Sequence, residues 1–88
     1  MNGIQGSFNG VYGNLNGVIG NGNKLVGNSN NVQGDSNGVV GSENKLTGNG
    51  NGIMGSQNTL FGNGNGVQGS LNSIWGDANA LVGNLNLV

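Results

Sequence analysis

A seven-residue motif repeats twelve times without interruption from Gly6 to the end of the chain. Each copy reads Gly, then Asn, Ser or Asp, any residue, Asn, any residue, Val, Ile or Leu, and any residue; the last copy lacks only its final place. Self-similarity at a fixed period is typical of repeat architectures, in which each unit packs on its neighbours. Because no copy carries an insertion, we expect one repeat domain over residues 1–88 and no loop set aside for a ligand.

The period of seven does not predict a coiled coil. A coiled coil needs two apolar positions in each heptad and strong helix formers between them. Each heptad here has one reliable aliphatic residue, and Gly and Asn, which are both poor helix formers, fill much of the rest. A composition with 21 Gly and 6% charged residues is typical of disordered segments. Disorder gives no reason for Asn and Val to stay in phase, however, so the strict period favours a folded chain.

The alternation of side chains along a strand explains the motif. The Gly that opens each copy is numbered heptad position 1. Positions 4 and 6 then point to one side of a strand, and positions 5 and 7 point to the other. Asn and the aliphatic residue then lie inside, and positions 2 and 3 form a corner. Two heptads return the chain to its start. The sequence therefore predicts an all-β fold, a two-sheet parallel β-solenoid (β-roll) with 14 residues per coil and about six coils.

The Asn at position 4 is expected to form structural ladders, in which each amide binds its equivalents in the coils above and below. A triangular coil of 21 residues is the alternative; Lys24 and Lys45 fit it, but Thr59 takes the same place 14 residues after Lys45. The expected ladder consists of Asn9, Asn16, Asn23, Asn30, Asn37, Asn44, Asn51, Asn58, Asn65, Asn72, Asn79 and Asn86.

Read as x-x-Asn-x-Val-x-Gly, the repeat resembles the ryegrass-type antifreeze domain, which inhibits ice recrystallisation, over the whole chain. The resemblance implies a left-handed β-roll with a Val core and Asn ladders at its bends. The heads of trimeric autotransporter adhesins are similar in topology, but they carry Ser and Ala where this chain has Asn and Val. In the ice-binding family the outward residues beside the Val are rich in Thr and Ser. Here only Thr47 and Thr59 match, and they form no array.

The composition gives no support to several classes of function. Without Cys or His, the chain has no thiol nucleophile, thiolate metal site or imidazole base, and we expect neither an enzyme nor a bound cofactor. Asp35 and Asp77 lie at corner position 2, where they are typical turn residues. Two Lys are too few to bind a nucleic acid backbone. No apolar run is long enough for a membrane span or a signal segment.

Alternate heptads face opposite sides, and on one side position 7 carries a column of outward apolar residues next to a nearly side-chain-free column at position 5. A contiguous apolar patch usually marks an interaction surface. We therefore predict a self-association face, in which a second copy lays its ridge against the groove. This apolar ridge consists of Tyr12, Val26, Val40, Met54 and Val82, with Gln68 between the last two.

Apolar residues at corner position 3 gather towards the two ends of the repeat, and neither end has a polar capping segment. The expected end contacts are Phe8, Leu15, Leu71 and Leu85. Open strand edges template further pairing, and end-to-end contact that does not close produces a filament. The leading interpretation is a structural protein whose partner is itself and whose filament is extracellular. Ice binding is the alternative, and an isolated stalk or spacer is a third possibility.

Overall fold

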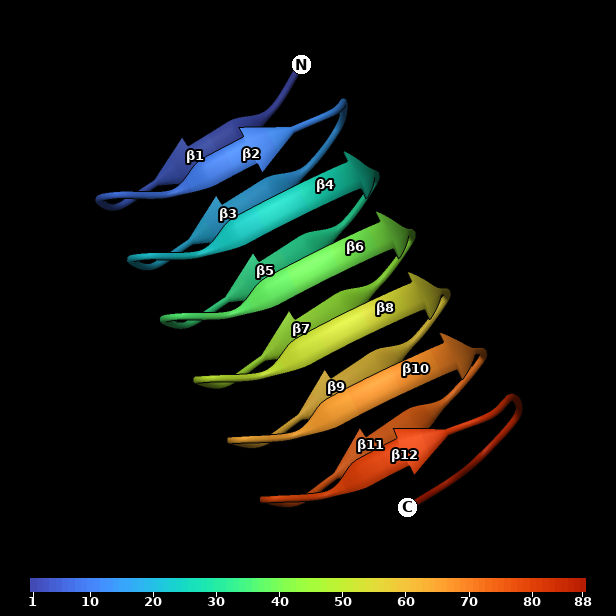
Figure 1. Cartoon of the computed structure of the whole chain (residues 1–88). Coiled ribbons are helices and arrows are strands. Elements are labelled where there is room, and N and C mark those ends of the chain that lie inside the picture. Colours follow the sequence, from blue (N-terminus) through green and yellow to red (C-terminus); the bar gives the residue numbers. More distant parts are fainter.

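A computed structural model describes all 88 residues, Met1–Val88, and consists of strands and corners only. Figure 1 shows the strands stacked in two layers along a straight rod, with the N-terminus at one end and the C-terminus at the other. The predicted all-β, two-sheet parallel solenoid is confirmed. Paired residues are 14 apart throughout, as in Val39 opposite Ile53, so each coil is two heptads rather than three.

Odd-numbered strands form one sheet and even-numbered strands form the other. Sheet A contains β1 (Gly3–Gln5), β3 (Gly17–Ile19), β5 (Asn31–Gln33), β7 (Lys45–Thr47), β9 (Thr59–Phe61) and β11 (Ser73–Trp75). Sheet B contains β2 (Gly10–Tyr12), β4 (Lys24–Asn28), β6 (Gly38–Ser42), β8 (Gly52–Ser56), β10 (Gly66–Ser70) and β12 (Ala80–Val82). All strand pairs are parallel. Successive strands begin seven residues apart, so each heptad supplies one strand and one corner.

The core is a double column of aliphatic side chains between the sheets, as the alternation predicted. Nine of them are buried: Val18, Leu25, Val32, Val39, Leu46, Ile53, Leu60, Val67 and Ile74. The same two columns continue to the ends of the rod, where they are less well covered. Val11 and Leu81 are only partly buried, and Ile4 and Val88 are each 49% exposed. These four residues lie in the outermost coils, where no further coil covers them.

The Asn ladder is present and lies inside the rod, with nine of its members buried, from Asn16 to Asn72. Asn44 shows the pattern. Its Nδ2 donates to Asn30 Oδ1 at 3.1 Å and to the Gly55 carbonyl at 2.8 Å, and its Oδ1 accepts from the Asn58 backbone N–H at 3.1 Å. No buried side-chain polar atom lacks a hydrogen bond. The ladder therefore places a polar column in a narrow core without the desolvation cost of unpaired amides.

The corners have a conformation that the sequence analysis did not predict. Every residue at position 3 from Phe8 to Leu85 has a φ between 57° and 66°, which is the left-handed region. The only sequence signal for it is the presence of Gly22, Gly50 and Gly64 at this position. Bulky residues such as Phe8 and Leu85 adopt the same conformation at a steric cost.

The position 2 side chains do more than favour a turn. On the corner that leads from sheet A to sheet B, they form a second ladder, in which each oxygen accepts a backbone N–H from the previous coil. Asp35 Oδ1 accepts the Asn21 N–H at 2.8 Å, and Asp77 Oδ1 accepts the Asn63 N–H at 2.9 Å. The run continues without interruption from Ser7 to Asp77. The two Asp carboxylates therefore serve the coil stacking.

Candidate functional site

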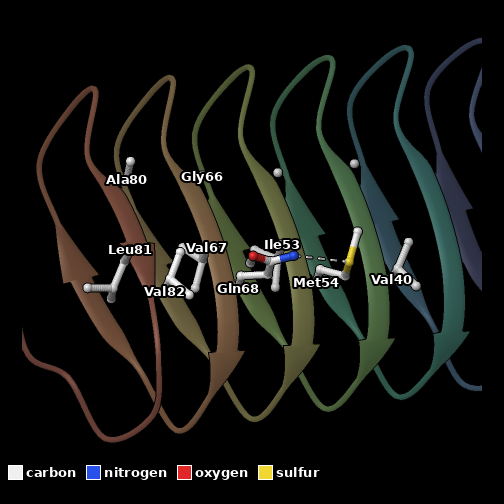
Figure 2. A pocket seen from close by; sticks show the side chains of 11 residues that line it. Val40, Ile53, Met54, Gly66, Val67, Gln68, Ala80, Leu81 and Val82 are labelled. Carbon is white, nitrogen blue, oxygen red and sulfur yellow. Dashed lines mark hydrogen bonds between the residues drawn. The ribbon is translucent and has the colours of Figure 1, made fainter.

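The predicted apolar ridge forms one column on the outer face of sheet B. Tyr12, Val26, Val40 and Met54 lie opposite one another in successive strands, and Gln68 and then Val82 continue the column. Figure 2 shows Val40, Met54, Gln68 and Val82 in one row across neighbouring strands. The ridge residues are between 42% and 80% exposed, so they have little cover within the chain. Gln68 Nε2 lies 3.9 Å from Met54 Sδ, which keeps this polar side chain within the row.

A groove of about 460 Å³ runs beside the ridge, and its lining is mostly apolar. The ridge from Val40 to Val82 forms one wall of the groove. The position 5 residues Gly38, Gly52 and Gly66 line the groove beside this wall. None of these three glycines has a positive φ, and a Cβ added at each would have no heavy atom within 4 Å. The fold therefore does not require Gly here. Gly weakens a strand and often marks a place where another backbone approaches closely.

Lys24 interrupts the glycine column towards the N-terminal end. It is the only charged residue in the strands of sheet B, and it lies between Gly10 and Gly38 in the position 5 column. A separate hollow of about 340 Å³ lies there, between Tyr12, Lys24 and Val26. The long uncharged groove is thus confined to the strands from β6 to β12.

The predicted end contacts occupy both edges of the rod. Leu71 and Leu85 lie one coil apart on the corner that leads from sheet B to sheet A, and the Leu85 N–H donates to the Ser70 carbonyl at 3.0 Å. Leu15 lies on the same edge near the N-terminal end, whereas Phe8 lies on the opposite edge. All four side chains are exposed, from 49% for Leu71 to 95% for Phe8. The structure therefore brings only Leu71 and Leu85 together within one chain.

The first and last coils present open edges with opposite hydrogen-bonding groups. Within the rod, each ladder Asn donates its backbone N–H to the Oδ1 of the Asn 14 residues earlier. Within these 88 residues, the N–H groups of Asn2 and Asn9 have no acceptor, and the Oδ1 atoms of Asn79 and Asn86 have no donor. One end of the rod therefore offers the donors of the ladder and the other end offers its acceptors.

The outer face of sheet A differs from that of sheet B. Phe61 and Trp75 pack with their ring centroids 5.4 Å apart and their planes tilted by 36°. Thr47 and Thr59 lie on neighbouring strands, β7 and β9, with Lys45 directly opposite Thr59. The face therefore combines a C-terminal aromatic pair and the isolated apolar side chain of Ile19 with polar residues, and it carries no continuous apolar column.

The structure contains no group of three or more acidic, His or Cys side chains that could hold a metal ion. No helix of a length and apolarity suited to crossing a membrane is present.

Comparison with known proteins identifies no family for this chain. Neither the protein families nor the curated proteins contain a match to the chain. Among solved structures, the polySia-specific acetyltransferase NeuO matches with 22% identity and a TM-score of 0.42. The match covers 99% of this chain and 50% of NeuO, so the chain spans half the length of that protein. A likeness this distant carries no inference about the activity of the chain.

Proposed function

We propose that this chain is a non-enzymatic structural subunit that assembles end to end into a filament. The observation that carries the proposal is the match between the two open coil edges. The last coil exposes the acceptors Asn79 Oδ1 and Asn86 Oδ1, and the first coil exposes the matching donors, the N–H groups of Asn2 and Asn9. Unpaired parallel edges of this kind template the addition of another strand.

The heptad phase fixes how a second copy would join. Suppose that a second copy stacks on the first so that three places of the repeat stay empty between Val88 and the Met1 of the second copy. The motif then continues in phase, because Val88 and the Ile4 of the second copy are seven places apart. In that register, Asn2 of the next copy faces Asn79, and its Asn9 faces Asn86. Each copy then spans an odd number of heptads, so the next copy is turned by half a turn about the solenoid axis.

The same register covers the apolar groups that the single chain leaves open. Ile4 of the next copy would stack on Leu81, and its Val11 on Val88, so that the aliphatic core continues across the junction. Phe8 of the next copy would lie against Leu85 at the corner. Each buried aliphatic side chain contributes about 1 kcal/mol or more. A copy added without the half turn would place its residues 1–4 where residues 85–88 already lie.

The junction is tested by Ile4→Lys, with Ile19→Lys as its matched control. Both side chains are isoleucine and both are 49% exposed in the single chain, so neither change should disturb the fold. Ile4 points into the junction, however, whereas Ile19 points outward from sheet A. We expect Ile4→Lys to stop elongation and Ile19→Lys to leave it intact in sedimentation velocity. Equal elongation of the two variants would contradict the proposed junction.

Ice binding is a second candidate function. The 14-residue coil and the buried Asn ladder agree with what the ryegrass resemblance implies, and Thr47 and Thr59 lie together on the outer face of sheet A. The bulky Phe61 and Trp75 on the same face oppose a flat Thr array. We expect ice crystals grown in micromolar protein to keep an unfaceted shape. Faceting that disappears in Thr47→Lys, but not in Gln68→Lys on sheet B, would favour ice binding instead.

A further inference from the structure

The outer face of sheet B carries its ridge and its groove side by side, and this arrangement restricts how two copies can meet. The ridge lies at position 7, with Val40 and Met54 as examples, and the groove lies at position 5, with Gly38 and Gly52. These two columns are two residues apart along each strand. We consider a second copy whose sheet B faces that of the first and which is related to it by a two-fold axis in the plane of the interface. The coils of the two copies stay aligned when this axis runs along the strands or along the solenoid.

The two directions have different consequences. An axis parallel to the strands places ridge against ridge, so that Met54-type side chains meet and the grooves stay empty. A two-fold axis parallel to the solenoid makes the strands of the two copies antiparallel but leaves their solenoids parallel, with the coils in the same order. When this axis passes between the two columns, each ridge lies over the partner's groove. Interdigitated side chains without an intervening void retain their dispersion contacts. We propose that a second copy pairs with the outer face of sheet B in this parallel, ridge-in-groove arrangement.

The glycines give this arrangement its strongest support. Gly38, Gly52 and Gly66 have no positive φ and no steric need to lack a side chain, so their effect is to leave room on the outer face. A partner side chain from the ridge fills that room. The groove strands carry no charge from β6 to β12, so two copies do not repel each other there. Lys24 occupies the position 5 column nearer the N-terminus and limits the contact to the later coils.

The size of the face indicates when pairing occurs. The Cα trace extends 30 Å by 21 Å across the broad face of the rod, a flat area of about 630 Å², whereas a stable complex buries about 800 Å² per partner. One pair of single chains is therefore weak, and pairing becomes stable when several faces act together along a filament. This inference thus rests on the end-to-end assembly proposed above. The half turn at each junction directs successive sheet B faces to opposite sides, so the expected product is a layer of aligned filaments.

The first test fills the groove. Gly52→Val should block the partner's ridge, whereas Gly10→Val makes the same change in the same column, on the far side of Lys24 and outside the proposed contact; both glycines have open space around them and no positive φ. By electron microscopy, the wild-type chain and Gly10→Val should form layers, and Gly52→Val should form single filaments of normal length. Single filaments from the wild-type chain would overturn the pairing and leave the end-to-end function intact. A wild-type chain that stays monomeric would overturn both.

The second test determines the direction of pairing. The chain has no Cys, so single-cysteine variants report one contact each. In the parallel arrangement every ridge residue lies near its own copy in the partner, so Val40→Cys and Val82→Cys should both be cross-linked by a short bis-maleimide. If the two solenoids were antiparallel, only residues in the coil at the symmetry axis would face their own copies in the partner. Val40 and Val82 lie three coils apart, so at most one of the two variants could then be cross-linked. Cross-linking of one variant alone, or of neither in assembled material, would overturn the parallel arrangement.

Discussion

Val39→Asp is expected to remove much of the stability of the folded chain. The Val39 side chain is completely buried in the double aliphatic column, where it packs between the two sheets. A carboxylate there would have no cationic partner, and an uncompensated buried charge costs about 3–5 kcal/mol. The stability of a domain of this size is on the order of 5–10 kcal/mol. Circular dichroism against temperature should therefore show a large fall in Tm or no folded baseline.

Gln33→Asp is the control for this change. Gln33 is the last residue of β5 and occupies heptad position 7, so its side chain is exposed on the outer face of sheet A. The new carboxylate stays in water, so a change of no more than about 0.5 kcal/mol is expected. If both variants melted at the same temperature, the assignment of inward and outward positions would be wrong.

Gly41→Ala should be as damaging as the buried charge, although it adds one methyl group. Gly41 has a φ of 134°, and a Cβ on it would lie 1.8 Å from the carbonyl oxygen of Gly55 in the next coil. The contact is between backbones, so no side chain can move aside. Relief would require the two coils to separate and their ladder hydrogen bonds to break. We expect a loss above about 4 kcal/mol, which few point mutations reach.

The matched control is Gly38→Ala, three residues earlier in the same strand. Gly38 has no positive φ, and an added Cβ would meet no heavy atom within 4 Å. Replacing Gly by Ala at a compatible site stabilises a protein by about 0.4–1 kcal/mol, because the unfolded chain loses freedom. Urea denaturation should therefore show opposite signs for the two glycines. Similar midpoints for both variants would contradict the close coil contact at position 1.

The division of the heptad into inside and outside could be predicted from the sequence. Asn44 and Leu46 are two residues apart, so a strand points both to the same side, and the repetition of that pair leaves few other folds. The lengths of the coil and of the ladder followed from the same phase. The composition did not reveal that Ile4 and Val88 would stay half exposed, because exposure at the ends depends on what covers them.

The corners could not be predicted in the same way. Leu85 and Phe8 have no preference for a positive φ, and their conformation is fixed by the coil-to-coil hydrogen bonds on each side of them. The second ladder, in which Asp35 accepts the Asn21 N–H, requires the spacing between coils and not only the presence of a turn residue. Long-range pairing of this kind becomes visible only in the folded structure.

The candidate site was predictable in its residues but not in its geometry. The apolar ridge from Tyr12 to Val82 appears in the sequence as every fourteenth residue. That Gly52 is free of backbone strain, unlike Gly41, emerges only from the dihedral angles and the space around each glycine. This difference separates the glycines that the coil requires from those that leave a groove.

Sedimentation velocity of the purified chain over a range of concentrations tests the central claim most directly. Because the two open edges are complementary and the added copy recreates the same edge, assembly should continue without closing. We predict a broad distribution of large species that shifts to higher sedimentation coefficients as the concentration rises. A single species with the mass of one 8.7 kDa chain at the highest attainable concentration would contradict the account.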